Sequence, residues 1–358
     1  MKQSILLTTC LLMLAATAQA QDTCLEQNWQ TFVDDAPVRM TFGPWLGADK
    51  QLAGRFRFDT HAGDNFLLRD PAGGWQAVNP DGVALAHLTL ECGDNLTLTG
   101  TWRTADGQLT FPLKAEYALS YRSLAPSVIK NIGQGVKGGR TYDQLEVTLV
   151  PEARSIRLHG KTASIAAIND AQQKAMLDYA ERALDCQSYA WLRDRTRQPA
   201  IPPHEDQLLL LNSELAVIAR NHPRACEEDY AFDYQQTEIL NLQNGDKEEV
   251  LSWLSEPDAV IASQYEVQTE KTTYAGTLSQ LIWQAYRHPN PDCAAQVTFT
   301  LEDRLLYPAA RGMAFLPRAR SEAKDCVVPA LVPYRQLQPL LSALGKRHAK
   351  TILATPAD

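Results

Sequence analysis

Two short motifs in this chain match the spacing of catalytic or nucleotide-binding loops. Gly133, Gly135 and Gly138 follow the G-x-G-x-x-G spacing of a dinucleotide site. Such a site needs a strand before the glycines and a helix after them, so that a helix N-terminus meets the pyrophosphate. Here a strand is expected to follow, so the glycines predict a flexible connection and no nucleotide cofactor.

The second motif is the pair Ser127 and Lys130, which repeats the Ser-x-x-Lys of penicillin-recognising enzymes. Those enzymes also need a Ser-Asp-Asn element and a Lys-Thr-Gly strand. The nearest candidate, Lys161 and Thr162, is followed by Ala163. It also comes too soon after Lys130 for a large helical domain to lie between them. We therefore interpret the match as chance.

Other catalytic and metal-binding patterns are absent from the sequence. It contains no G-x-S-x-G, no H-E-x-x-H and no calcium loop, and its seven histidines form no short ligand cluster. There is no Cys-x-x-Cys, and His222 with Cys226 is a lone pair. The sequence thus predicts no catalytic residue, no metal and no cofactor.

The candidate ligand-binding residues form an acidic segment followed by aromatics: Glu227, Glu228, Asp229, Tyr230 and Phe232. The acids could present a charged rim, and the aromatics anchors, to a basic protein such as lysozyme. The alternative is a solvated acidic loop that leads into a strand whose aromatics lie in the core. The pattern favours this second interpretation.

The N-terminus predicts export. Lys2 precedes an apolar run from Ile5 to Ala16, and the small residues Ala18 and Ala20 suit a signal peptidase. We expect residues 1–20 to be a signal peptide cleaved near Ala20, and the mature chain to be periplasmic or secreted. A lipoprotein site at Cys10 is disfavoured because two threonines precede it. No later stretch is long and apolar enough to be expected to cross a membrane.

Composition narrows the class of protein. Removal of 20 of the 358 residues leaves 338, a length typical of roughly two domains. Lys2 is one of 34 basic residues, so the mature chain has 33 against 42 acidic ones, a net charge of −9. Nucleic acid binding needs clustered basic residues, so we exclude it. An acidic chain is compatible with a basic protein partner.

An even number of cysteines in an exported protein favours disulfides. The mature chain has six, which allow fifteen pairings: Cys24, Cys92, Cys186, Cys226, Cys293 and Cys326. Sequential pairing is our prediction, because it keeps each bridge within one structural unit. Each loop closure should contribute about 3–4.5 kcal/mol on the chain-entropy model.

Residues 21–121 predict an all-β domain. Hydrophobic residues alternate with polar ones from about residue 38 to 121, the period of half-buried strands. Strands are expected at 52–58, 84–90, 96–102 and 109–117, with turns at Asn79–Gly82 and Asp106–Gly107. Residues 122–140 contain Pro126 and four glycines, and predict a linker or flexible loop.

Residues 141–358 predict an α+β domain with an antiparallel sheet and two or three helices, because helices and strands are mixed without a regular βαβ alternation. The expected strands are 145–149, ending at Pro151, then 234–242, 296–301 and 312–316. Residues 208–219 are interpreted as a helix passing into a strand, or as a strand alone. Helices are expected at about 164–185, around residues 278–285, and at the end of the chain, where Leu337, Leu340, Leu341 and Leu344 share one face.

Several segments of the second half occur in a recognisable order: Leu145–Pro151, Ile168–Asn169, Ile239–Lys247, Leu301–Leu306 and Val332–Leu337. This order resembles the extracytoplasmic domain shared by lysozyme-sensing anti-sigma factors and by accessory regions of some cell-wall deacetylases, over about residues 141–345. The resemblance implies an α+β fold that binds and does not catalyse.

Two further comparisons qualify that resemblance. Members often carry a Gly-Gly-Ala-His loop where this chain has Pro223–Glu228, so a ligand role of that loop does not carry over. The first half, from Leu52–Phe58 to Thr99–Gly107, resembles a small β domain of uncharacterised exported bacterial proteins. That similarity implies strands and no activity.

Together these observations predict an exported bacterial envelope protein that binds a protein or a cell-wall ligand, such as a lysozyme-like protein or a peptidoglycan component, without catalysis. The alternative is an envelope hydrolase, or an accessory subunit of a cell-wall-modifying enzyme, whose carboxylates are brought together only by the fold. A scaffold for other envelope proteins is the third possibility.

Overall fold

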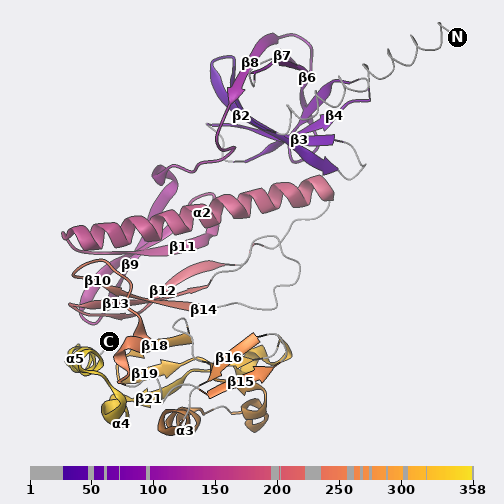
Figure 1. Ribbon diagram of the computed structural model, residues 1–358. Helices are drawn as coiled ribbons and strands as arrows, with labels where there is room; N and C mark the ends of the chain where they lie inside the picture. Colours follow the sequence, from indigo (N-terminus) through magenta and orange to yellow (C-terminus); the bar gives the residue numbers. More distant parts are fainter. Residues whose placement is uncertain are drawn as a thin grey trace, which may run out of the picture. The chain divides into compact units, whose positions relative to one another are not determined.

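A computed structural model of the chain has two compact units (Figure 1). One comprises residues 1–125 and 181–200, and the other residues 126–180 and 201–358. The structure describes residues 27–46, 52–59, 63–71, 73–93, 97–194, 201, 203–221, 235–255, 262–266, 269–273, 276–287, 289–300, 305–319 and 321–356. No helix in these ranges has the length and apolarity that a bilayer crossing requires. The predicted signal peptide lies outside them.

The predicted all-β region is a closed, eight-stranded antiparallel barrel in which each strand pairs with the next and β8 pairs back to β1. Its strands are β1 (Asn28–Val33), β2 (Ala36–Leu46), β3 (Leu52–Phe58), β4 (Asn65–Arg69), β5 (Trp75–Val78), β6 (Ala84–Gly93), β7 (Thr97–Thr104) and β8 (Thr110–Tyr117). The four strands expected from alternation are confirmed as β3, β6, β7 and β8.

The interior of the barrel is filled with large apolar side chains. Trp29, Trp75 and Phe56 are fully buried there. Ring edges meet ring faces, with Phe42 and Trp75 4.8 Å apart and Phe56 and Trp102 5.1 Å apart between centroids. Eight strands leave an interior just wide enough for side chains, so this is a packed core.

Helix α2 (Ala163–Arg193) contributes to both units, and its final turns belong to the first. There Leu192 is buried against outward-facing residues of β3, β4 and β5. Trp191 stacks on Phe66 with 3.6 Å between ring centroids, and its Nε1 donates to the carbonyl of Pro80 at 2.7 Å. The predicted helix ended at Asp185. It is longer because these partners, distant in sequence, stabilise two more turns.

The second unit is built on a six-stranded sheet in the order β14-β13-β12-β11-β10-β9. Its strands are β9 (Ile129–Lys137), β10 (Arg140–Val147), β11 (Val150–Leu158), β12 (His204–Leu211), β13 (Leu215–Asn221) and β14 (Gln235–Asn241). Neighbours are antiparallel except β11 and β12, whose parallel pairing covers only Ala153 with His204 and Arg154 with Glu205. The sheet is therefore two three-stranded halves joined by a short seam.

Three expectations for this region are corrected. Residues 129–140, read as part of a linker, form β9 and its hairpin turn to β10. Pro151 does not end a strand but lies in β11, and residues 208–219 form parts of two strands of a hairpin without any helix. Glycines and prolines marked these places as breaks, but strand pairing tolerates them here.

Two layers cover the sheet in Figure 1. The first part of α2 packs on one side through Ile165 and Ile168. The other side receives β18 (Leu306–Ala309), β19 (Gly312–Phe315), β21 (Ala330–Pro333), the 3-10 helix η2 (Val250–Trp253) and helices α3 (Gly276–Ala285), α4 (Tyr334–Leu337) and α5 (Ala343–Leu353). The strand predicted at 234–242 is confirmed as β14, and that around 312–316 as β19.

The prediction of one continuous C-terminal helix is wrong. The chain leaves helical geometry at Leu341, which forms a single bridge with Leu254, and α5 then starts afresh with Ser342 as its N-cap. On α5, His348 is buried and stacks on Trp253 at 4.7 Å, with Nδ1 3.3 Å from Glu214 Oε2. Burial lowers the pKa of His348.

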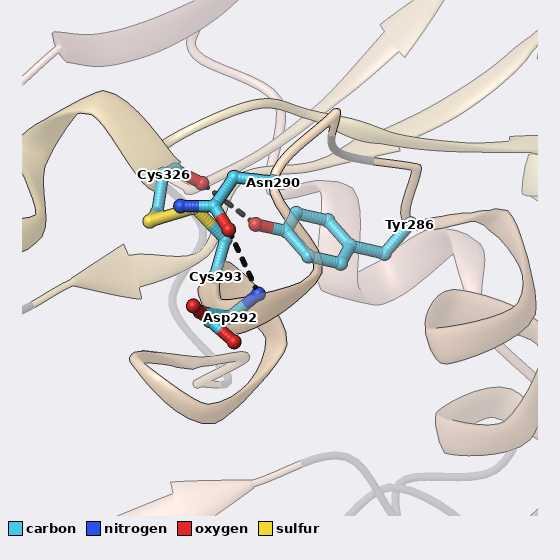
Figure 2. The surroundings of a disulfide bond; sticks show 5 residues. All are labelled: Tyr286, Asn290, Asp292, Cys293 and Cys326. Carbon is cyan, nitrogen blue, oxygen red and sulfur yellow. Dashed lines mark hydrogen bonds between the residues drawn. A yellow bond between two sulfur atoms is a disulfide. The ribbon is translucent and has the colours of Figure 1, made fainter.

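A disulfide lies in the layer that contains α3. Cys293 and Cys326 are bonded, with their Cα atoms 5.2 Å apart, which confirms the predicted pair (Figure 2). The Tyr286 hydroxyl donates to the Cys326 carbonyl at 2.8 Å, and the Asn290 side chain accepts from the Asp292 amide at 3.0 Å. The bridge thus lies within a hydrogen-bonded turn next to α3.

Candidate functional site

The strands on both sides of the β11–β12 seam line a cavity of about 490 Å³, within the size range of small-molecule sites. Its walls come from five consecutive strands: Ile132 on β9, Tyr142, Gln144 and Leu145 on β10, Arg154, Ser155 and Ile156 on β11, Glu205, Asp206 and Gln207 on β12, and Ala219 on β13. We call it the sheet cavity. No strand supplies it alone, so it exists only because the two half-sheets meet.

Strand alternation decides which side chains the sheet cavity offers to a ligand. Leu145, Ile156 and Ala219 are buried and form apolar wall. Their neighbours Gln144, Arg154, Glu205 and Gln207 are exposed. The cavity therefore presents two amides and one charge of each sign beside apolar surface, groups that hydrogen-bond to hydroxyls and amides.

A buried ionic network fixes the wall behind these residues. Asp206 accepts from Arg220 Nε at 2.7 Å and from Ser155 Oγ at 2.5 Å, and Arg220 also bonds to Gln172 on α2. Burial alone would lower the pKa of Arg220, but the charge of Asp206, its hydrogen bond and the charge of Glu238 together raise that pKa. Asp206 is thus held by partners, and its role is to position the seam.

The neighbouring carboxylates on β10 are also paired. Asp143 accepts from Arg157 Nε and His159 Nε2, each at 2.9 Å. Burial opposes ionisation of Asp143, but hydrogen bonds from Arg157 and His159 hold its pKa well below the ordinary value. For Glu146 the hydrogen bond from Lys130 lowers the pKa. Both groups stay anionic, whereas a general acid needs a raised pKa.

A buried charge cluster lies in the first unit, on the outer wall of the barrel. Asp64 accepts from Arg122 Nη2 at 2.6 Å, from Tyr121 at 2.9 Å and from Ser188 at 2.5 Å. Asp185 accepts from Arg55 at 2.6 Å. Burial and the charge of Asp64 raise the pKa of Tyr121, so its hydroxyl keeps the proton it donates. We call this the clasp, because it ties the final turns of α2 to the barrel.

The candidate ligand-binding residues predicted from sequence are not in the described ranges. Glu227, Glu228, Asp229, Tyr230 and Phe232 lie outside the described residues, as do Cys24 and Cys226. Cys92 and Cys186 are each disulfide-bonded. Their predicted partners, Cys24 and Cys226, remain predictions. Within the described ranges, no group of three or more His, Cys, Asp or Glu side chains is placed to hold a metal.

The sheet cavity was missed by the sequence analysis. Its polar members alternate with buried residues and so look like the solvent side of ordinary strands. The one available signal was the polar run His204–Gln207, directly before the apolar residues of β12.

Comparison with models of known protein families and with curated proteins returns no match to this chain.

Proposed function

We propose that this protein is an exported, non-catalytic binding protein that takes a polar cell-wall fragment in the sheet cavity. Export is supported by the oxidised state of every described cysteine, namely Cys92, Cys186, Cys293 and Cys326. Disulfides persist in oxidising compartments and are rare in the cytosol. The signal-like N-terminus points the same way.

The observation that carries the binding proposal is the lining of the sheet cavity. Gln144 and Gln207 each offer an amide that both donates and accepts, while Arg154 only donates and Glu205 accepts when ionised. A sugar–peptide fragment carries hydroxyls and amides that complement such a set, and the apolar wall suits the faces of sugar rings. A cavity of about 490 Å³ suits a fragment of this size better than the flat surface of a folded protein.

The alternative, an envelope hydrolase, needs one carboxylic acid with a raised pKa beside a carboxylate. On β10, Asp143 and Glu146 have lowered pKa values and are each paired with cations. Neither is therefore suited to be that acid.

The test is calorimetric titration of the mature protein with purified soluble muropeptides, with Gln144→Ala and Gln207→Ala as variants. Both side chains are exposed, so neither truncation should unfold the sheet. We expect each to weaken binding by about tenfold, the value of one to two hydrogen bonds. Gln108→Ala, on the exposed hairpin between β7 and β8, is the matched control and should bind as the wild type does.

Two outcomes would overturn the proposal. One is a failure of the wild-type protein to bind muropeptides; the other is binding that both cavity variants retain in full. Parallel titration with lysozyme tests the protein ligand suggested by the resemblance. Muropeptide cleavage by the wild-type protein would support the hydrolase instead.

A further inference from the structure

A second cavity in the same unit, of about 630 Å³, differs from the first in its charge. It forms where the β9–β10 hairpin, the β12–β13 turn and the end of α5 come together. Its walls are Gly138, Arg140, Asn212, Ser213, Arg347, Lys350, Thr351, Ala354, Thr355 and Pro356. We call it the hairpin cavity. It is separate from the sheet cavity and shares no lining residue with it.

The lining of the hairpin cavity is cationic. Arg140, Arg347 and Lys350 supply three positive charges, and none of its described lining residues is an Asp or Glu. Two of these cations lie on the last turns of α5, where they complement the negative end of the helix dipole. The helix dipole does not account for Arg140, which lies on β10 and lines the same cavity.

One acid, Glu214, contacts the wall of this cavity through Thr351. Glu214 follows Ser213 in the chain, and its two oxygens lie 3.3 Å from Thr351 Oγ1 and 3.3 Å from His348 Nδ1. Arg140 Nη1 donates to a neutral acceptor, the Asn212 carbonyl, at 2.9 Å. Among the described residues, no carboxylate contacts Arg140, so its other donors can meet a ligand.

Asn212 holds the wall of the hairpin cavity in place. The residue is 4 % exposed, and its Oδ1 accepts from the amides of Glu214 at 2.8 Å and Leu215 at 2.7 Å. These bonds fix the orientation of the amide group, so Nδ2 is the donor, and it has no hydrogen-bond partner among the described residues. Nδ2 is itself enclosed by protein, so Asn212 contributes a rigid part of the wall.

The backbone brings the three elements together. Gly138 has φ of +54°, and a Cβ there would collide with the Leu211 carbonyl oxygen and lie 2.8 Å from Thr355 Cγ2. Only glycine permits this approach of the hairpin to β12 and to the end of α5. The cavity is thus a fixed feature of the fold.

We propose that the hairpin cavity binds an oxyanion, a phosphate or carboxylate group on a small molecule or polymer. The guanidinium of Arg140 and the charges of Arg347 and Lys350 pair with the oxyanion, and the Asn212 amide supports the wall on which it lies. Charge-assisted hydrogen bonds of this kind are stronger than neutral ones.

The experiment uses the full mature chain and two probes, inorganic phosphate and acetate, followed by backbone NMR shifts at constant ionic strength set with sodium chloride. Both probes should shift the amides of residues 138–140, 212–213 and 350–355. Preference for phosphate would assign a phosphorylated ligand, and preference for acetate a carboxylate. Lys350→Glu should weaken binding by about tenfold or more, because an attractive charge becomes a repulsive one.

The matched control is Lys174→Glu, which makes the same charge change at an exposed position of α2, outside the cavity. The part of α2 in this unit and α5 pack on opposite sides of the sheet, so the control should leave probe binding within about twofold, since the charge is largely screened over that separation. Absence of localised shifts with either probe would overturn the proposal. Equal weakening by both variants would also overturn it, since the effect would then be general electrostatics. Neither variant touches the sheet cavity, so the two proposals stand or fall separately.

Discussion

Replacement of Asp64 by Asn is the sharpest test of the clasp. Asn has nearly the same volume and can still accept a hydrogen bond, so the change removes charge with little change in packing. The side chain of Asp64 is 2 % exposed, and Arg122 beside it is equally buried. The substitution leaves the clasp with two arginines against the single carboxylate of Asp185.

The magnitude follows from that burial. Breaking a buried ion pair by removing one partner costs about 3–5 kcal/mol, because the other charge is left uncompensated. Asp185 has the same chemistry, but its side chain is 34 % exposed. Water can therefore reach this position and solvate part of the arginine charge that the substitution leaves unpaired. Asp185→Asn should cost only about 1–2 kcal/mol. The structure thus predicts that Asp64→Asn costs more free energy of unfolding than Asp185→Asn, and by about how much.

Urea unfolding with hydrogen exchange measured on peptides from β3, β4 and the final turns of α2 would report the first unit directly. Asp81→Asn, on the exposed turn between β5 and β6, is the control and should change the free energy of unfolding by no more than about 0.5 kcal/mol. A loss below about 1 kcal/mol for Asp64→Asn, or a loss no larger than that of Asp185→Asn, would refute the reasoning.

Three further predictions concern stability. Asp34 and Asp35 turn the β1–β2 hairpin at φ of 49° and 62°, so Asp35→Gly should raise the unfolding free energy by about 0.5 kcal/mol, measurable by urea titration. His348 has a lowered pKa in the folded state, so the unfolded chain binds more protons below about pH 6.5 and stability falls on acidification. His348→Phe should therefore shrink the loss of unfolding free energy between pH 7 and pH 5; an unchanged loss would contradict this. Replacing Cys293 and Cys326 with Ala opens a loop of 33 residues and should cost about 3–4 kcal/mol by thermal unfolding, with no loss expected if the bridge were absent.

Local patterns predicted much of the fold. Alternation found β3, β6, β7 and β8, because each is half-buried and the period of two is then visible in the sequence. The sequence also predicted the Cys293–Cys326 bridge and the start of α2. These features depend on residues close together in the chain, or on simple pairing of neighbours.

Long-range partners explain what was missed. The last turns of α2 are stabilised by Phe66 and Asp64, more than a hundred residues earlier in the chain. The charged residues of the clasp have no regular spacing in the sequence. β9 was hidden because its glycines looked like a linker, yet Gly135 is the position against which Tyr142 of the next strand packs. Sequence patterns of neighbouring residues do not reveal such contacts.

Residues of β10 line both proposed sites, so substitutions in the two cavities can distinguish their ligands. Residues 140, 142 and 144 alternate along β10 and therefore share one side of it; Arg140 lines the hairpin cavity, and Tyr142 and Gln144 line the sheet cavity. A ligand with a neutral body and an anionic end would lose affinity in both Gln144→Ala and Lys350→Glu. A neutral ligand would respond only to the first change. A free anion would respond only to the second, so measuring both variants against each ligand assigns the cavity it occupies.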